Sequence, residues 1–327
     1  MTIRNTRRLL LGATTALAAA VLALPAHAQI GGVLRGAASR LGNRMPNADA
    51  LLSGTPPITS NIRDAVFAVD SLDNFTPREA KRSLMQLQRT PNGGFVLRPG
   101  YYEWHAQSYC LHAGTHGPGG GEGYLLAPTK GPAEDAVMSI LRNSVQHPEI
   151  DQHDIQYLLW AIIARAKFED LPTEQKATAA RLLTPRQLAG LNRNALDLLP
   201  GPSMQEMLDR APAPVRAVLQ AEANLRKMML DPTTSFSALE RTAVLAGMVG
   251  MGPGSREVPS GRWSLHPDGY YIRFFPMGYS YTVEEIWVPQ GSPAVGKEYD
   301  PSTVIAMPGN TARQRLVQSG REHAHGS

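Results

Sequence analysis

A long helical stretch enclosed between two β-rich segments is the feature of this sequence that most constrains its fold. Residues 93–111 and 262–288 are rich in aromatic and β-branched residues and have turn residues on both sides, a pattern typical of strands. Between them, residues 132–250 carry apolar residues at helical spacing and capping boxes such as the one at Thr184. Because a three-stranded meander is barely stable alone, we predict an α+β fold in which both groups of antiparallel strands join one sheet and flank the mainly helical segment. Two separate layers are the alternative.

The sequence also predicts the bounds of the domain and of the segments on either side of it. The predicted α+β domain spans residues 91–289 and ends with a β-meander at 262–289. Residues 29–90 have the composition of an N-terminal arm and linker, with one helix starting at the capping box Thr76-Pro77-Arg78-Glu79. Residues 290–327 are polar and are predicted to form a C-terminal tail, with one short strand starting near Thr303.

Residues 1–28 have the organisation of an export signal. Three arginines flank an uncharged apolar run over residues 9–24, and Ala26-His27-Ala28 matches a small-residue cleavage site. A membrane helix needs roughly 20 apolar residues, so cleavage is favoured over an uncleaved anchor. We therefore predict an exported protein, periplasmic or secreted, with no stable membrane span after cleavage. Arg7-Arg8 partly matches a twin-arginine motif, which makes that export route an alternative to general secretion.

The net charge and the cysteine count exclude a nucleic-acid partner and an intramolecular disulfide. Removal of the signal takes away three of the 32 basic residues and none of the 28 acidic ones, which leaves a formal charge of +1. A nearly neutral chain lacks the basic surface that nucleic acid requires, so no nucleic-acid partner is expected. Cys110 is the single cysteine, and it excludes an intramolecular disulfide although export implies an oxidising compartment. Ordinary packing must therefore stabilise the fold.

The densest group of chemically active residues surrounds this cysteine. Cys110 and His112 lie two apart, and on a strand they point to the same face, so they are candidates for a nucleophile and its base. With His116 they are also candidate ligands for copper or zinc. The spacing matches no tight zinc signature, and a free cysteine inside a strand is typical of a small buried hydrophobe. The cofactor is therefore undetermined, and the chain is predicted to function without one if Cys110 is buried.

A second candidate site is a surface of aromatic strand residues beside a glycine-rich loop. The loop, residues 114–123, contains six glycines in ten residues but lacks the lysine and hydroxyl residue of a phosphate-binding loop. Aromatic rings on a sheet face stack on sugars, peptides or partner proteins, although strand aromatics are also common in sheet cores. One lysine precedes a predicted helix start, where anions bind. The predicted binding residues are Trp104, Tyr109, Tyr124, Lys130 and Tyr271.

These observations favour a non-catalytic function. We expect an exported cell-envelope protein that binds a glycan, a peptide or a partner protein through the aromatic β surface and the glycine-rich loop. The alternative is a periplasmic Cys/His enzyme of hydrolase-like type, or a metal-binding protein, centred on Cys110, His112 and His116. The residues carry no motif that assigns the chain to a family.

Overall fold

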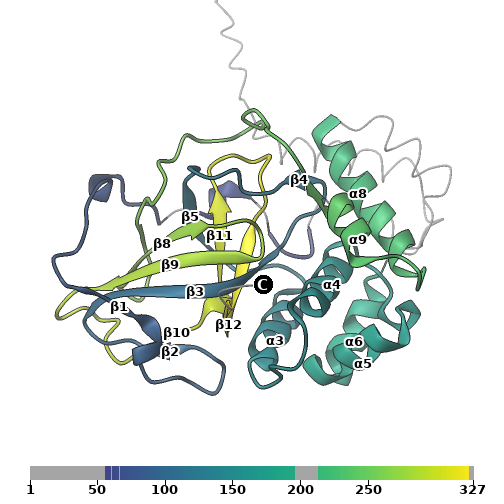
Figure 1. Cartoon of the computed structure of the whole chain (residues 1–327), viewed down its shortest axis with the longest axis horizontal. Helices are drawn as coiled ribbons and strands as arrows, with labels where there is room; N and C mark the ends of the chain where they lie inside the picture. Colours follow the sequence, from purple (N-terminus) through teal and green to yellow (C-terminus); the bar gives the residue numbers. More distant parts are fainter. Residues whose placement is uncertain (1–55, 60, 66, 196–212, 324–327) are drawn as a thin grey trace, which may run out of the picture.

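The computed structural model describes residues 56–195, apart from residues 60 and 66, and residues 213–323 (Figure 1). The predicted signal segment, residues 1–28, lies outside the described residues, as do residues 29–55 of the predicted N-terminal arm and linker. Within the described ranges, no helix combines the length and the apolar character of a membrane span.

An eight-stranded, mainly antiparallel sheet forms the centre of the molecule, and it contains both predicted groups of strands. The order is β5-β11-β12-β3-β9-β8-β7, with β1 added in parallel to β3. The amide of Leu126 in β5 donates to Ser264 Oγ of β7 at 3.0 Å, so the two ends of the sheet meet and the sheet is nearly a barrel. The prediction of one sheet is confirmed. The strands are β1 (Lys81–Ser83), β3 (Gly100–Cys110), β5 (Tyr124–Pro128), β7 (Ser264–Leu265), β8 (Tyr271–Pro276), β9 (Tyr281–Val288), β11 (Val304–Pro308) and β12 (Leu316–Glu322).

Short elements brace this sheet at its margins. Two two-stranded ladders join distant parts of the chain, one antiparallel and one parallel. They consist of β2 (Phe95–Val96) with β10 (Glu298–Tyr299), and β4 (Thr115–His116) with β6 (Val244–Leu245). The 3-10 helices are η1 (Ile62–Asp64), η2 (Asp70–Leu72), η3 (Leu84–Gln86), η4 (Phe168–Asp170) and η5 (Pro301–Thr303).

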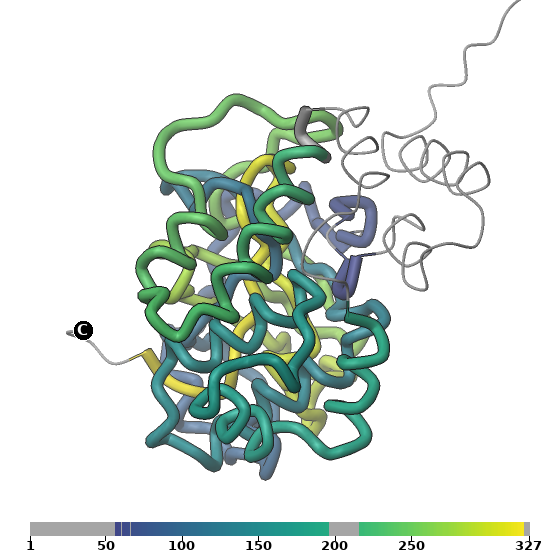
Figure 2. Tube along the Cα trace, turned by 90° about the vertical axis from the view of Figure 1, so that its right-hand side faces the viewer, coloured from purple at the N-terminus to yellow at the C-terminus, as the bar shows by residue number. Residues whose placement is uncertain are grey.

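The helices gather on one side of the sheet, as predicted from the periodicity of the central segment (Figures 1 and 2). They are α3 (Glu134–Ser144), α4 (Gln152–Ile163), α5 (Thr173–Leu182), α6 (Pro185–Arg193), α8 (Ala213–Met229) and α9 (Phe236–Ala243). Helix α4 is buried continuously from Ile155 to Ile163, because it lies between the sheet and the other helices. The capping box at Thr184 starts α6 as expected. The helical segment ends at Ala243, because the next two residues pair with β4.

The prediction of a polar C-terminal tail over residues 290–327 is wrong. Strands β11 and β12 lie inside the sheet, and residues 313–320 are buried. Several polar side chains of this stretch donate hydrogen bonds to backbone carbonyls inside the fold. Gln314 Nε2 donates to the carbonyls of Thr115 and Ala243, and Arg315 Nη1 donates to two nearby carbonyls. Buried polar groups that find partners are compatible with a core. The polar composition of residues 290–327 therefore does not imply an exposed tail.

The predicted helix after Thr76 is also absent from the described residues 76–87. The chain forms β1 and the 3-10 helix η3 there instead. Lys81 of β1 is aligned with Tyr101 of β3, and its ammonium bonds to Glu103. Pairing with the sheet therefore outweighs the local helix signal, as tertiary contacts commonly do.

Candidate functional site

Three of the five predicted binding residues belong to the core. Trp104 and Tyr124 are 1% exposed, and Tyr109 is completely buried. Trp104 lies on the face of β3 that packs inward, directly opposite Glu284 of β9. The expectation that these three rings form a binding surface is therefore wrong, because their strands direct them into the core.

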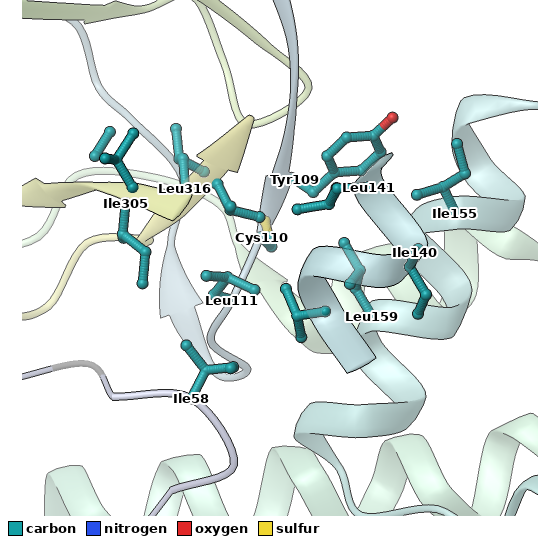
Figure 3. Close-up of a cluster of buried hydrophobic side chains, with 14 of the residues drawn as sticks. Ile58, Tyr109, Cys110, Leu111, Ile140, Leu141, Ile155, Leu159, Ile305 and Leu316 are labelled. Carbon is teal, nitrogen blue, oxygen red and sulfur yellow. The ribbon is translucent and has the colours of Figure 1, made fainter. Parts of the chain in front are cut away.

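Cys110 lies where the sheet meets the helices and is completely buried (Figure 3). Its amide donates to Gln156 Oε1 of α4 at 2.7 Å, and Gln156 Nε2 donates back to its carbonyl at 3.2 Å. Burial raises the pKa of the thiol well above its ordinary value, and the negative charge of Glu240 adds to the effect. Since the thiolate is the reactive form, the geometry gives no support to Cys110 as a nucleophile with His112 as its base.

The predicted metal site is not assembled either. Among residues 56–195 and 213–323, as far as they are described, no three His, Cys, Asp or Glu side chains are placed to hold a metal ion. The chain leaves β3 after Cys110, and His116 enters β4, where it pairs with Leu245 of β6. Cys110, His112 and His116 therefore do not form a copper or zinc site.

Lys130 and the glycine-rich loop are engaged in local contacts. Lys130 Nζ pairs with Asp64 at 2.5 Å. In the loop, the amide of Gly119 donates to Glu122 at 3.1 Å, and Glu122 forms an ion pair with Arg313 at 2.9 Å. These contacts fix the loop and the lysine but do not join them to the aromatic strands. Tyr271 is the remaining predicted binding residue, and it is only half-buried.

Tyr271 lies in a row of mostly apolar side chains that crosses the outer face of the sheet, the face opposite Trp104. The register aligns one residue from each of five neighbouring strands. In order across the face they are Leu265, Tyr271, Trp287, Tyr101 and Lys81. We call this line the aromatic row.

Trp287 is the centre of an aromatic cluster in this row. Its ring centroid lies 4.9 Å from that of Tyr271 and 4.9 Å from that of Phe75. The indole of Trp263 is completely buried beside it, with centroids 6.5 Å apart, and donates from Nε1 to the carbonyl of Phe75. Phe75, Tyr271 and Trp287 remain half-buried, so they form an accessible aromatic platform on a fixed base.

A charged row runs beside the aromatic row. Arg273, Glu285, Glu103 and Ser83 are aligned across β8, β9, β3 and β1. Glu285 is the centre of its contacts: it accepts from Arg273 Nε at 2.6 Å, from Lys81 Nζ at 3.0 Å and from the Tyr101 hydroxyl. Lys81 also bonds to Glu103. Arg273, Glu285 and Glu103 are therefore connected through Lys81 in a network that borders the platform.

His105 extends the network to a third row. Its Nε2 lies 3.1 Å from Glu103 Oε1, and its Nδ1 lies 2.5 Å from the Tyr281 hydroxyl. The Tyr281 ring stacks on that of His323, with centroids 4.4 Å apart. Hydrogen bonds and ring contacts thus hold Glu103, His105 and Tyr281 in place on the outer face of β3 and β9.

The charges of this network are stable at neutral pH. Burial would raise the pKa of Glu285, but hydrogen bonds from Tyr101, Lys81 and Arg273 outweigh it and lower the pKa. Burial opposes the same change at Glu103, where bonds from Lys81 and His105 lower the pKa. The pKa of Lys81 is raised, because bonds to both carboxylates outweigh the effect of burial. A general acid or base works best with a pKa near the operating pH, and these three groups are all shifted away from it.

Sequence reasoning missed Phe75 and the charged row, and it placed Trp287 among the strand aromatics without selecting it as a binding residue. The alternation of Val283, Glu285 and Trp287 shows that these side chains share one face, but it does not identify their neighbours on other strands. Comparison of the chain with family models, curated proteins and solved structures gave no match. The geometry of this face is therefore the guide to function.

Proposed function

We propose that the protein is a non-catalytic, exported glycan-binding protein of the cell envelope, and that the outer face of β1, β3, β9 and β8 is its binding surface. The observation that carries the proposal is the half-buried platform of Phe75, Tyr271 and Trp287 beside the charged row. Aromatic rings provide apolar contact for the C–H groups of a sugar. Carboxylate and guanidinium groups fixed in place provide acceptors and donors for its hydroxyls.

A glycan fits this surface better than a protein partner does. Stable protein interfaces bury about 800 Å² on each side around an apolar centre. Among the exposed large hydrophobic side chains of the described residues, Leu265 alone belongs to the aromatic row. The outer face is instead a narrow aromatic strip bordered by charges, which matches a chain of polar rings.

A peptide that binds by strand addition is also a poorer fit. Such a peptide needs a free sheet edge with unpaired backbone groups. The edge strand β7 has only two residues, and its Ser264 already contacts β5 at the other end of the sheet. The near closure of the barrel thus supports binding through side chains on the face rather than through a sheet edge.

Export is the part of the proposal that depends on the sequence alone. The support is the predicted signal over residues 1–28, with its cleavage site at Ala26-His27-Ala28. A periplasmic or secreted protein meets polysaccharides directly. N-terminal sequencing of the protein recovered from the cell envelope tests this step, and a chain that starts at Gln29 is the expected result.

The binding proposal is tested on a glycan microarray with the full chain and three variants. Trp287→Ala and Tyr271→Ala remove platform rings, and each is expected to weaken binding about tenfold or more, as loss of a central aromatic contact does. Met277→Ala is the matched control, because Met277 is exposed in the turn between β8 and β9 and lies outside the platform. Circular dichroism confirms that each variant is folded.

Two results would overturn this proposal. One is binding of a glycan with equal affinity by the wild type and both platform variants. The other is absence of binding to the array and to insoluble peptidoglycan, chitin and cellulose. Trp287→Phe keeps an aromatic ring between Tyr271 and Phe75, so partial recovery of affinity in that variant supports ring contact over a general loss of packing.

A further inference from the structure

The helical layer contains a cleft that the proposed function does not use. Its volume is about 720 Å³, and its walls are formed by α3, by α6 and by the C-terminal end of α4. Figure 2 views the helical side of the molecule, where these helices lie below α8 and α9. Small residues form much of the lining, including Pro132, Ala133, Ala136 and Ala166, and they leave room that larger side chains would fill. Ligand sites typically have volumes of about 300–1,000 Å³.

The lining of this cleft contains more arginines than acids, and two of the arginines lie beside acids outside the lining: Arg142 pairs with Asp300 and Arg165 interacts with Glu222. Among its described lining residues are four arginines, Arg142, Arg165, Arg186 and Arg193, and a single acid, Asp135. Arginine is the side chain best suited to planar, bidentate binding of phosphate and carboxylate groups. The excess of guanidinium groups in a recess of this size indicates an anionic ligand.

Helix α6 presents two of these arginines on one side. Arg186, Gly190 and Arg193 are spaced at i, i+4 and i+7, so they lie on the same face of the helix. Gly190 has no side chain, and a Cβ there would meet only Arg193 Nη2, at 3.8 Å. The glycine therefore leaves a gap between two guanidinium groups.

The position of α6 is fixed by side-chain contacts. Gln187 Nε2 donates to Ser139 Oγ of α3 at 2.7 Å, and Asn192 Oδ1 accepts from the amide of Phe168 at 2.7 Å. On the opposite wall, Arg142 Nε donates to Asp300 Oδ2 at 2.7 Å, which fixes the orientation of its guanidinium. The arginines of both walls thus extend from anchored elements.

Arg165 provides an independent observation. It follows the C-cap of α4 with a φ of 53°, in the left-handed region where glycine is the usual residue. A side chain in this conformation is strained, and such strain is concentrated at functional sites. Burial lowers the pKa of Arg165, while the charge of Glu222 opposes this shift. The fold therefore retains an arginine at the floor of the cleft where glycine would relieve strain.

We infer that this cleft binds a small organic anion that carries phosphate or carboxylate groups. Arg186 and Arg193 of α6 contact the anionic groups, and Arg142 and Arg165, which lie beside Asp300 and Glu222, add positive charge to the lining. The inference is independent of glycan binding, because the two sites lie on different layers of the molecule.

Isothermal titration calorimetry of the full chain with pyrophosphate and with citrate, at constant ionic strength in chloride, tests the inference. Pyrophosphate represents the phosphate chemistry and citrate the carboxylate chemistry. The double variant Arg186→Gln/Arg193→Gln is expected to weaken binding about tenfold or more, because it removes two charged hydrogen-bond donors. Arg181→Gln is the matched control, because Arg181 is an exposed arginine of α5 that pairs with Glu149 and does not line the cleft.

Each outcome of the titrations either supports or overturns the inference. Binding of either anion that is lost in the double variant and kept in Arg181→Gln supports the inference, and the tighter of the two anions identifies the ligand chemistry. Absence of binding by both anions, or equal loss in the double variant and the control, overturns it.

Discussion

At the scale of single residues, two buried ionisable side chains remain uncharged at neutral pH. Cys110 is fixed between β3 and α4, and Glu284 points into the core from β9, where the Tyr299 hydroxyl donates to it at 2.5 Å. Burial raises the pKa of Glu284 to about 8, although the bond from Tyr299 opposes the shift. The same low polarity that makes Cys110 unreactive thus keeps Glu284 protonated.

Native Cys110 is predicted to resist thiol reagents. Since the thiol is completely buried and its pKa is raised, Ellman's reagent should label the folded protein only as fast as the protein unfolds. In guanidinium chloride the same protein should be labelled stoichiometrically, which serves as the control. Rapid labelling of the native protein at pH 7 would restore the Cys/His enzyme as a candidate.

Glu284 is predicted to make stability depend on pH. Its pKa is higher in the folded state than in the unfolded state, so its contribution is most favourable below about pH 4.5 and is lost as the pH rises to about 8. Glu284→Gln mimics the protonated form and removes this dependence. Urea unfolding of both proteins from pH 5 to pH 9 should show the variant gaining stability relative to the wild type up to about pH 8 and then levelling off. A constant difference across this range would show that Glu284 is ionised when folded.

At the scale of elements, the position of β12 explains why the end of the chain is essential. This strand lies between β3 and β11, and Leu316 and Val317 are completely buried. Leu316 is aligned with Cys110 and packs in the core near Ile305 (Figure 3). A segment that is polar in sequence therefore completes the centre of the sheet.

Leu316→Ala is predicted to cost about 2–5 kcal/mol of unfolding free energy, the usual range for a truncated core leucine. Urea unfolding monitored by far-UV circular dichroism measures the cost. Val295→Ala is the control, because Val295 is 43% exposed and its loss should change stability by less than about 0.5 kcal/mol. Equal effects of the two substitutions would be inconsistent with a central β12.

The same contrast shows how far sequence reasoning extends. Helical spacing and strand alternation predict α4, β8 and β9 well, because each has a regular apolar pattern of its own. They do not predict β12, whose polar residues Gln318 and Ser319 are buried in the sheet, nor the burial of Trp104 and Tyr124. Which face of a strand becomes the core depends on the elements that pack against it, and a local pattern does not contain that information.

At the scale of the whole molecule, the sheet is assembled from both ends of the described chain and the helices cover one side of it (Figure 1). Helix α4 packs against the end of β3 through Gln156, and β4 pairs with β6 across the helical segment. The helical segment and the sheet thus share one core, although the helices are continuous in sequence.

A fragment of residues 132–250 is predicted not to fold on its own. Without the sheet, the apolar faces of α3 and α4 would be exposed to water, which removes most of their stabilisation. Circular dichroism of the fragment should show little cooperative melting, whereas the full chain should melt in a single transition. Independent, cooperative melting of the fragment would indicate a separate helical domain.

The most direct test of glycan binding uses Trp287 as its own reporter. The other three tryptophans, Trp104, Trp160 and Trp263, are at most 1% exposed, so acrylamide quenching of native fluorescence reports mainly Trp287. Soluble chitin oligosaccharides, β-glucan and peptidoglycan fragments are titrated in turn. The account predicts that a glycan that binds lowers the quenching constant of the wild type and has no such effect in Trp287→Phe. A glycan that binds by calorimetry but leaves the quenching of Trp287 unchanged would contradict it.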